Sequence, residues 1–390
     1  MSITFPDGFL WGTATAAHQV EGSNWNNNWW EWEHNPASPC VDVSGDACDH
    51  YTRYPADIAL LRELGFGAYR FSLEWSRMEP ERGEWSRVQL DHYKRTIATC
   101  RENELLPVVT FHHFTDPRWI AAEGGWENPQ TVDEFARFCE YAVNGLGDDI
   151  GIACTLNEPN VVAMMGYILG QFPPGAADFD RYLVANDLLR QAHDKSRDIL
   201  KAGPGNFPVG MTLSMADWYA EPGGEDVMAM ARNQMEDVFL ESAQADDYVG
   251  AQMYTRITMS TDGLPLMARP DTRTTLMGYE FWPQAAEATV RYAAEKARVP
   301  VIVTENGIAT ADDAERIEYV TAALEGVKRC IDDGIDVRGY FYWSCLDNFE
   351  WAEGWKPAFG LVAVDRATQQ RTVKPSARWL GRIARTNRMD

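Results

Sequence analysis

The chain has 390 residues, 45% of them hydrophobic and 24% charged, so it can bury a large core and is neither disordered nor fibrous. Its 35 basic and 58 acidic residues leave a net charge of -23, which repels nucleic-acid phosphates and anionic membrane surfaces. We therefore expect no nucleic-acid partner and no membrane partner.

Targeting and redox signals predict a cytoplasmic location. The start, MSITFPDGFLWG, lacks the basic and apolar regions of a secretory signal. The longest apolar run, Val161–Gly170, is too short for the roughly 20 residues that span a bilayer. The seven cysteines are odd in number and form no CxxC pair, which fits a reducing compartment; a Cys40–Cys48 disulfide is the weaker alternative.

No repeat, charge block or linker divides the sequence, so we predict a single domain over residues 1–390. Short apolar runs rich in β-forming residues recur along it and predict eight strands. In chain order these are Phe9–Ala14, Ala68–Leu73, Leu106–Phe111, Ile150–Leu156, Val209–Leu213, Tyr248–Met253, Val299–Thr304 and Arg338–Trp343.

Amphipathic stretches between most of these strands predict helices. Ala56–Leu64 ends at Gly65, a typical helix C-terminus. Thr131 with Glu134 is read as a capping box, and Pro283 stands where a helix can begin. A further helix is expected over Asp312–Asp333, before Gly334.

Apolar strands that alternate with helices imply a parallel sheet buried on both faces. Eight such units favour a closed (β/α)8 TIM barrel over an open doubly wound sheet. No GxGxxG motif follows the first strand, which removes the main support for dinucleotide binding.

Barrel enzymes carry their chemistry at the C-terminal ends of the strands. Nearly all the predicted strands end near a hydrogen-bonding, ionisable or aromatic side chain. Taken alone, each of these is better explained as an ordinary polar loop residue. Together they predict a functional site at this rim. In chain order they are Gln19, Arg70, His113, Asn157 with Glu158, Trp218, Tyr254, Glu305 and Trp343.

Two segments share one form, because CTLNEP and VIVTENG each place an apolar strand before a Glu beside an Asn. A pair of carboxyl groups across a cleft is what glycoside hydrolysis requires, one as a proton donor and one to stabilise or attack the developing oxocarbenium ion. Repulsion between the two raises one pKa, so that one group stays protonated. An isolated Glu in so acidic a chain is more ordinarily solvated or salt-bridged.

These residues stand in motifs that resemble glycoside hydrolase family 1, the β-glucosidase family, over essentially the whole chain. The motifs are FPDGFLWGTATAAHQVEG, DHYTRYPADIALLRELGFGAYRFSLEWSR, TLNEP, VTENG and GYFYWSCLDNFEWAEGW. The resemblance implies a (β/α)8 barrel, no cofactor, and a retaining double displacement. In that reaction Glu158 matches the general acid/base and Glu305 the nucleophile.

The same resemblance implies a shell of residues around the terminal sugar. Arg70 and Tyr254 match the pair that holds the nucleophile, and Trp343 matches the aromatic platform beneath the sugar. Amide and carboxylate groups suit vicinal hydroxyls, and an indole suits the apolar C–H face of a sugar. The residues that match the hydroxyl-binding shell are Gln19, His113, Asn157, Glu350 and Trp351.

The sequence also departs from the family pattern. It is short, and the deficit is placed between Trp218 and Tyr248, which predicts a wide aglycone site. Glu350 would repel a 6-phosphate, although Lys356 is nearby, so a free 6-hydroxyl is favoured. Substituted positions around the site are Phe114, Ala153, Gln252, Met253 and Ala358.

We therefore predict an exo-acting β-glucosidase with β-galactosidase and β-fucosidase side activity, which takes a small β-glycoside or an oligosaccharide. A homo-oligomer is possible. Three alternatives stay open. They are a β-glycosidase that mainly transglycosylates to alcohol or glycoside acceptors, a non-catalytic sugar-binding barrel, and a metal-dependent hydrolase that uses His18, His112 and His113. A metal site is disfavoured, because no Cys/His or HExxH spacing accompanies these histidines.

Overall fold

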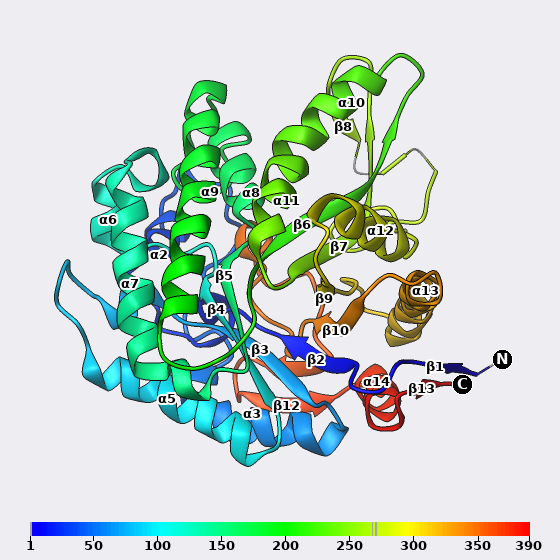
Figure 1. Cartoon of the computed structure of the whole chain (residues 1–390), viewed down its shortest axis with the longest axis horizontal. Helices are drawn as coiled ribbons and strands as arrows, with labels where there is room; N and C mark the ends of the chain where they lie inside the picture. Colours follow the sequence, from blue (N-terminus) through cyan, green and yellow to red (C-terminus); the bar gives the residue numbers. More distant parts are fainter. Residues whose placement is uncertain (1, 267, 270) are drawn as a thin grey trace.

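The computed structural model of the chain describes residues 2–266, 268–269 and 271–390. Within these ranges eight parallel strands form a closed barrel in the order β2-β3-β4-β5-β6-β7-β9-β10 (Figure 1). The barrel closes because β10 pairs with β2 and β6 pairs with β7. The predicted (β/α)8 barrel is confirmed. Its strands are β2 (Leu10–Ala14), β3 (Ala68–Ser72), β4 (Leu106–His112), β5 (Ile152–Asn157), β6 (Val209–Ala220), β7 (Val249–Met259), β9 (Val301–Asn306) and β10 (Val337–Trp343).

Helices surround the barrel on its outside (Figure 1). The helices of eight or more residues are α3 (His50–Leu64), α5 (Arg87–Glu102), α7 (Gln130–Leu146), α9 (Phe179–Ala202), α10 (Glu225–Arg232), α12 (Ala285–Ala297), α13 (Asp313–Asp332) and α14 (Pro375–Thr386). Shorter α-helices are α1 (Ala17–Val20), α2 (Asn28–Glu33), α4 (Trp75–Met78), α6 (Arg118–Ala122), α8 (Pro159–Ala163) and α11 (Val238–Ser242). Single 3-10 or π turns are η1 (Gly125–Glu127), η2 (Gly147–Asp149), η3 (Met164–Ile168), η4 (Asn233–Asp237), η5 (Ala243–Ala245) and η6 (Trp351–Glu353).

Small antiparallel pairs complete the fold. β1 (Ile3–Thr4) pairs with β13 (Arg388–Met389), so the two ends of the chain lie side by side (Figure 1). β11 (Val362–Asp365) pairs with β12 (Gln370–Val373), and β8 (Pro265–Leu266) extends the edge of β7. None of the helices in the described ranges is long and apolar enough to cross a bilayer.

Two strands are longer than their apolar runs predicted. β6 continues to Ala220 and β7 to Met259, and the two remain paired to these ends. The reason is a separate apolar cluster in which Ala216, Trp218 and Met259 pack against residues of α10. The Trp218 indole donates a hydrogen bond to Glu236 in this cluster at 2.6 Å. The expectation that Trp218 belongs to the rim site was therefore wrong.

The ends of the helices show where local sequence signals determine the first or last residue of a helix and where they do not. Gly65 ends α3 in the left-handed region at φ 110°, and the Asp312 carboxylate caps α13 by accepting from Ala314 N. The capping box was wrong, because α7 begins one residue before Thr131. The Thr131 hydroxyl instead donates to the Gly125 carbonyl at 2.6 Å.

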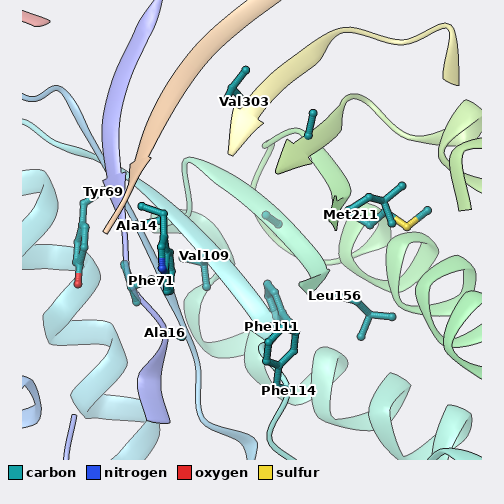
Figure 2. Packing of buried hydrophobic residues seen from close by; sticks show 14 of the residues in the cluster. Ala14, Ala16, Tyr69, Phe71, Val109, Phe111, Phe114, Leu156, Met211 and Val303 are labelled. Atoms are coloured by element: carbon teal, nitrogen blue, oxygen red, sulfur yellow. The ribbon is translucent and has the colours of Figure 1, made fainter. Parts of the chain in front are cut away.

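Alternation along the strands divides the barrel interior into layers. Alternate strand residues share one face, so Ala68 and Arg70 both point inward, as do Val108 and Thr110. The layer at the N-terminal end is apolar, and the next layer toward the C-terminal end is polar. Outward-facing Tyr69, Phe71, Val109 and Phe111 belong to the larger core shared with the helices (Figure 2). The apolar layer consists of Leu10, Ala68, Leu106, Val108, Ile152, Tyr248, Ile302 and Phe341.

Gly12 is required by this apolar layer. A Cβ at Gly12 would lie 2.4 Å from the Phe341 ring and 2.9 Å from the Ala68 carbonyl oxygen. We expect Gly12→Ala to lower the free energy of unfolding by about 1–3 kcal/mol, as overpacking does. Gly67→Ala is the matched control, because a Cβ there meets nothing within 4 Å. Urea unfolding of both variants is the measurement, and equal midpoints would contradict the packing argument.

Candidate active site

A fully buried guanidinium links the strands at the C-terminal rim. Arg70 on β3 donates from Nη1 to Glu305 Oε1 at 2.6 Å, from Nε to Thr110 Oγ1 at 3.1 Å, and from Nη2 to Asn157 Oδ1. The second oxygen of Glu305 accepts the Tyr254 hydroxyl at 2.7 Å. Four side chains predicted from the sequence, Arg70, Asn157, Tyr254 and Glu305, therefore form one connected group.

Glu158 lies next to this group but in a different environment. It follows β5 in the left-handed region at φ 44°, a conformation that costs a non-glycine residue about 1–2 kcal/mol. Its backbone N–H donates to the Thr212 carbonyl at 2.8 Å, which ties it to β6. The carboxyl group is buried, and its Oε1 has no hydrogen-bond partner among the described residues. Strain of this kind is typical of functional sites.

The two carboxyl groups have different electrostatics. Burial, followed by repulsion from Glu305, raises the pKa of Glu158 well above its usual value. Burial also raises the pKa of Glu305, but the Arg70 charge and the hydrogen bonds from Tyr254 and Gln252 oppose this. The arrangement therefore favours a proton on Glu158 and a negative charge on Glu305.

The predicted sugar shell lies around these carboxyl groups. The Gln19 amide donates to the Phe349 carbonyl at 2.8 Å, to Asn348 Oδ1 at 3.1 Å and to Glu350 Oε2 at 3.4 Å. Its Oε1 is buried without a partner among the described residues. Because buried polar atoms are usually paired, this oxygen is positioned to accept a hydrogen bond from a ligand hydroxyl. The Trp343 indole N–H also contributes to holding Glu350.

Stacked rings form one wall of the shell. The His113 ring lies 5.9 Å from Trp343 and 6.1 Å from Trp351, nearly parallel to both. Burial and the Arg70 charge lower the pKa of His113 well below its usual value, so the ring is neutral. His18 stacks on the Trp351 ring at 5.7 Å. All ten predicted site residues are thus gathered at one end of the barrel.

The histidines proposed as alternative metal ligands have other partners. His18 contacts Glu33 at 3.1 Å, and His112 contacts Asp116 at 2.9 Å. Asn27 Oδ1 accepts from Trp30 N, so its amide N–H2 faces His18 Nδ1 and fixes that ring as an acceptor there. In the part of the chain that the structure describes, no three His, Cys, Asp or Glu side chains gather as a metal site. All seven cysteines are free.

Sequence reasoning missed several residues of the site. Thr110 and Thr212 contact Arg70 and were not predicted, whereas Gln252, noted from the sequence only as a substituted position, contacts Asn157. A signal was available, because Thr212 and Gln252 are polar residues inside runs expected to be buried on both faces. Tyr279 is half-buried after β8, and burial near Glu350 and Glu158 raises the pKa of its hydroxyl above the ordinary value. No strand pattern pointed to it.

Comparisons with known proteins agree with this geometry. The family model described as glycosyl hydrolase family 1 matches residues 1–264 and 252–389. The chain belongs to glycosyl hydrolase family 1. This family 1 chain is 33% identical to a 1,4-beta-D-glucan glucohydrolase of Thermotoga neapolitana over 440 residues, which covers 98% of each chain. It is 32% identical to beta-glucosidase A of Thermotoga maritima, with 99% of each chain covered.

A solved β-glycosidase structure is also closely similar. The crystal structure of beta-glycosidase BGL167 has a TM-score of 0.92 and 46% sequence identity, and the match covers 98% of this chain and 97% of that one. The alignment to the Thermotoga neapolitana enzyme spans 440 positions, whereas this chain has 390 residues. Relatives therefore carry residues that this family 1 chain lacks.

The buried carboxyl groups predict a pH-dependent stability. Burial and repulsion from Glu305 raise the pKa of Glu350 from 4.5 to about 8. Its contribution to folding is therefore fully present below pH 4.5 and is lost as the pH rises through about 8. At pH 8.5 we expect Glu350→Gln to raise the free energy of unfolding by on the order of 1 kcal/mol, which raises Tm by a few degrees. At pH 5 the increase in Tm should be smaller. Thermal unfolding at both pH values is the measurement, and an equal Tm difference would contradict the shifted pKa.

Proposed function

We propose that the protein is a retaining exo-β-glycosidase that hydrolyses terminal non-reducing β-D-glucosyl residues by double displacement. The chain is a glycosyl hydrolase of the β-glucosidase type, as its family and its full-length relatives show. One observation carries the finer proposal, namely the unequal environments of the two glutamates. Glu305 receives an Arg70 N–H and the Tyr254 hydroxyl, whereas Glu158 keeps a buried oxygen without a partner in the described ranges.

In the first step we assign Glu305 as the nucleophile. Its carboxylate attacks the anomeric carbon while the bond from that carbon to the glycosidic oxygen breaks. Glu158 transfers its proton to the departing oxygen, so the aglycone leaves as a neutral alcohol. The raised pKa of Glu158 keeps that proton available near neutral pH. The products of this step are a glycosyl ester on Glu305 and an ionised Glu158.

In the second step Glu158 acts as a base. It takes a proton from a water molecule, whose oxygen attacks the anomeric carbon and displaces Glu305. Two inversions retain the β-configuration. The ester on Glu305 removes its negative charge, so the pKa of Glu158 falls between the two steps and suits each role in turn.

The shell residues are proposed to select the sugar. Gln19 and Glu350 are held together by a hydrogen bond and present oxygen atoms to neighbouring hydroxyls. The Glu350 carboxyl group can form a hydrogen bond with the 4-hydroxyl in either epimer, so glucosides, galactosides and fucosides should all be turned over. Trp343 and Trp351 offer indole faces to the apolar side of the ring. The wide aglycone site stays a prediction.

Initial rates on 4-nitrophenyl glycosides test the proposal. The panel contains the β-glucoside, β-galactoside, β-fucoside, β-mannoside, β-xyloside and 6-phospho-β-glucoside, each with chelator present. We expect the β-glucoside or the β-fucoside to lead, and the 6-phosphate to be inactive at pH 8.5, where Glu350, with its pKa raised to about 8, is ionised and repels it. If the folded protein hydrolyses none of these substrates, the non-catalytic barrel is favoured. If activity is lost only when chelator is present, a metal-dependent hydrolase is favoured.

Two substitutions separate the roles of the glutamates. Glu305→Gly should lower kcat at least about a thousandfold, and azide should restore turnover by forming the α-glycosyl azide. Glu158→Gln should slow an alkyl glucoside about a hundredfold more than a 2,4-dinitrophenyl glucoside, because the activated phenol needs no proton. Product configuration is read by NMR. The role assignment fails if both variants respond alike to leaving group and azide.

A further inference from the structure

We propose that Gln252 and Thr212 are positioning residues that orient the Asn157 amide toward the sugar hydroxyl beside the nucleophile. Gln252 lies on β7, opposite Ser214 of β6 and Glu305 of β9 in the parallel register. Thr212 lies on β6, and its backbone carbonyl accepts from the Glu158 N–H. The two residues therefore stand between the strands that carry the catalytic pair. This inference rests on the function proposed above.

The direction of the Asn157 amide is fixed by charge. An arginine side chain can only donate, so the Asn157 atom that faces Arg70 Nη2 must be the carbonyl oxygen. The same oxygen accepts from Thr212 Oγ1 at 3.1 Å and from Gln252 Nε2 at 3.0 Å. Three donors on one oxygen leave the Asn157 N–H2 facing away from them, 3.2 Å from His113 Nε2.

The direction of Gln252 follows from that of Asn157. The Gln252 atom that faces an oxygen must be its N–H2, which has two hydrogens to donate. One goes to Asn157, and the other is directed at Glu305 across the β7–β9 pairing, where it opposes the rise in the pKa of Glu305. Gln252 is fully buried, and its Oε1 has no partner among the described residues, so the hydrogen bonds that orient its amide are those of the N–H2 group.

The consequence concerns one contact in the transition state. The 2-hydroxyl is the sugar group next to the anomeric carbon, and hydrogen bonds to it strengthen as the oxocarbenium-like transition state forms. The family resemblance implies that Asn157 bonds this 2-hydroxyl, and Gln252 lies beside both Asn157 and the proposed nucleophile, Glu305. A rotated or displaced Asn157 amide would lower kcat more than it raises KM, and only for a substrate that has a 2-hydroxyl.

The test compares 4-nitrophenyl β-D-glucoside with its 2-deoxy analogue. Gln252→Met keeps the length of the side chain and removes both polar ends, and Thr212→Val keeps the shape and removes the hydroxyl. On the glucoside we expect Gln252→Met to lose about 30-fold and Thr212→Val about 10-fold in kcat. On the 2-deoxy analogue we expect Thr212→Val to lose less than about threefold and Gln252→Met about fivefold, because Gln252→Met also removes the hydrogen bond to Glu305. Thr212→Ser should recover most of the loss of Thr212→Val.

The controls separate positioning from general damage. Gln191→Met makes the same substitution at an exposed position of α9 and should leave both rates unchanged. Equal losses on the two substrates, or no loss in either variant, would overturn the positioning role. Thr212→Val carries the test if Gln252→Met does not fold. If the wild-type protein does not hydrolyse the glucoside, the proposed function and this inference are both overturned. If the wild type is active and the variants are unaffected, only this inference is overturned.

Discussion

The buried charge of Arg70 is the constraint on which the site depends. A guanidinium in the barrel interior is stable only if its N–H groups are paired and its charge is balanced. Thr110, Asn157 and Glu305 supply those partners from three other strands. The pairing requires all four strands to keep their register, so the arrangement that stabilises the charge also positions the groups proposed as catalytic.

This single charge also makes the two glutamates different. Glu305 is within direct hydrogen-bond distance of Arg70, whereas Glu158 is repelled by Glu305 and its Oε1 has no hydrogen-bond partner among the described residues. A proton is therefore kept on one carboxyl group and excluded from the other, although both are buried glutamates beside asparagines. The proposed division of roles arises from neighbours on different strands and not from the local motifs.

Much of the fold was predictable because the strands are buried on both faces. Such strands appear as short apolar runs, and all eight were located to within a few residues, apart from the extended ends of β6 and β7. Those extensions depend on packing against α10, which no local pattern reveals. Trp218 was misplaced for the same reason. Thr131 was misread because the helix geometry before it, not its side chain, decides where α7 begins.

The sequence by itself determined the barrel, the family resemblance and the ten residues proposed for the site, because motif order and strand-end positions can be read from the sequence alone. Only the tertiary structure decided how these residues act on one another. The orientation of the Asn157 amide, the contacts of Thr212 and Gln252, and the position of Tyr279 depend on strands distant in sequence. The direction of a hydrogen bond and the pKa of a group depend on which residues lie near it in space. The periodicity of one strand does not show which residues another strand places beside it.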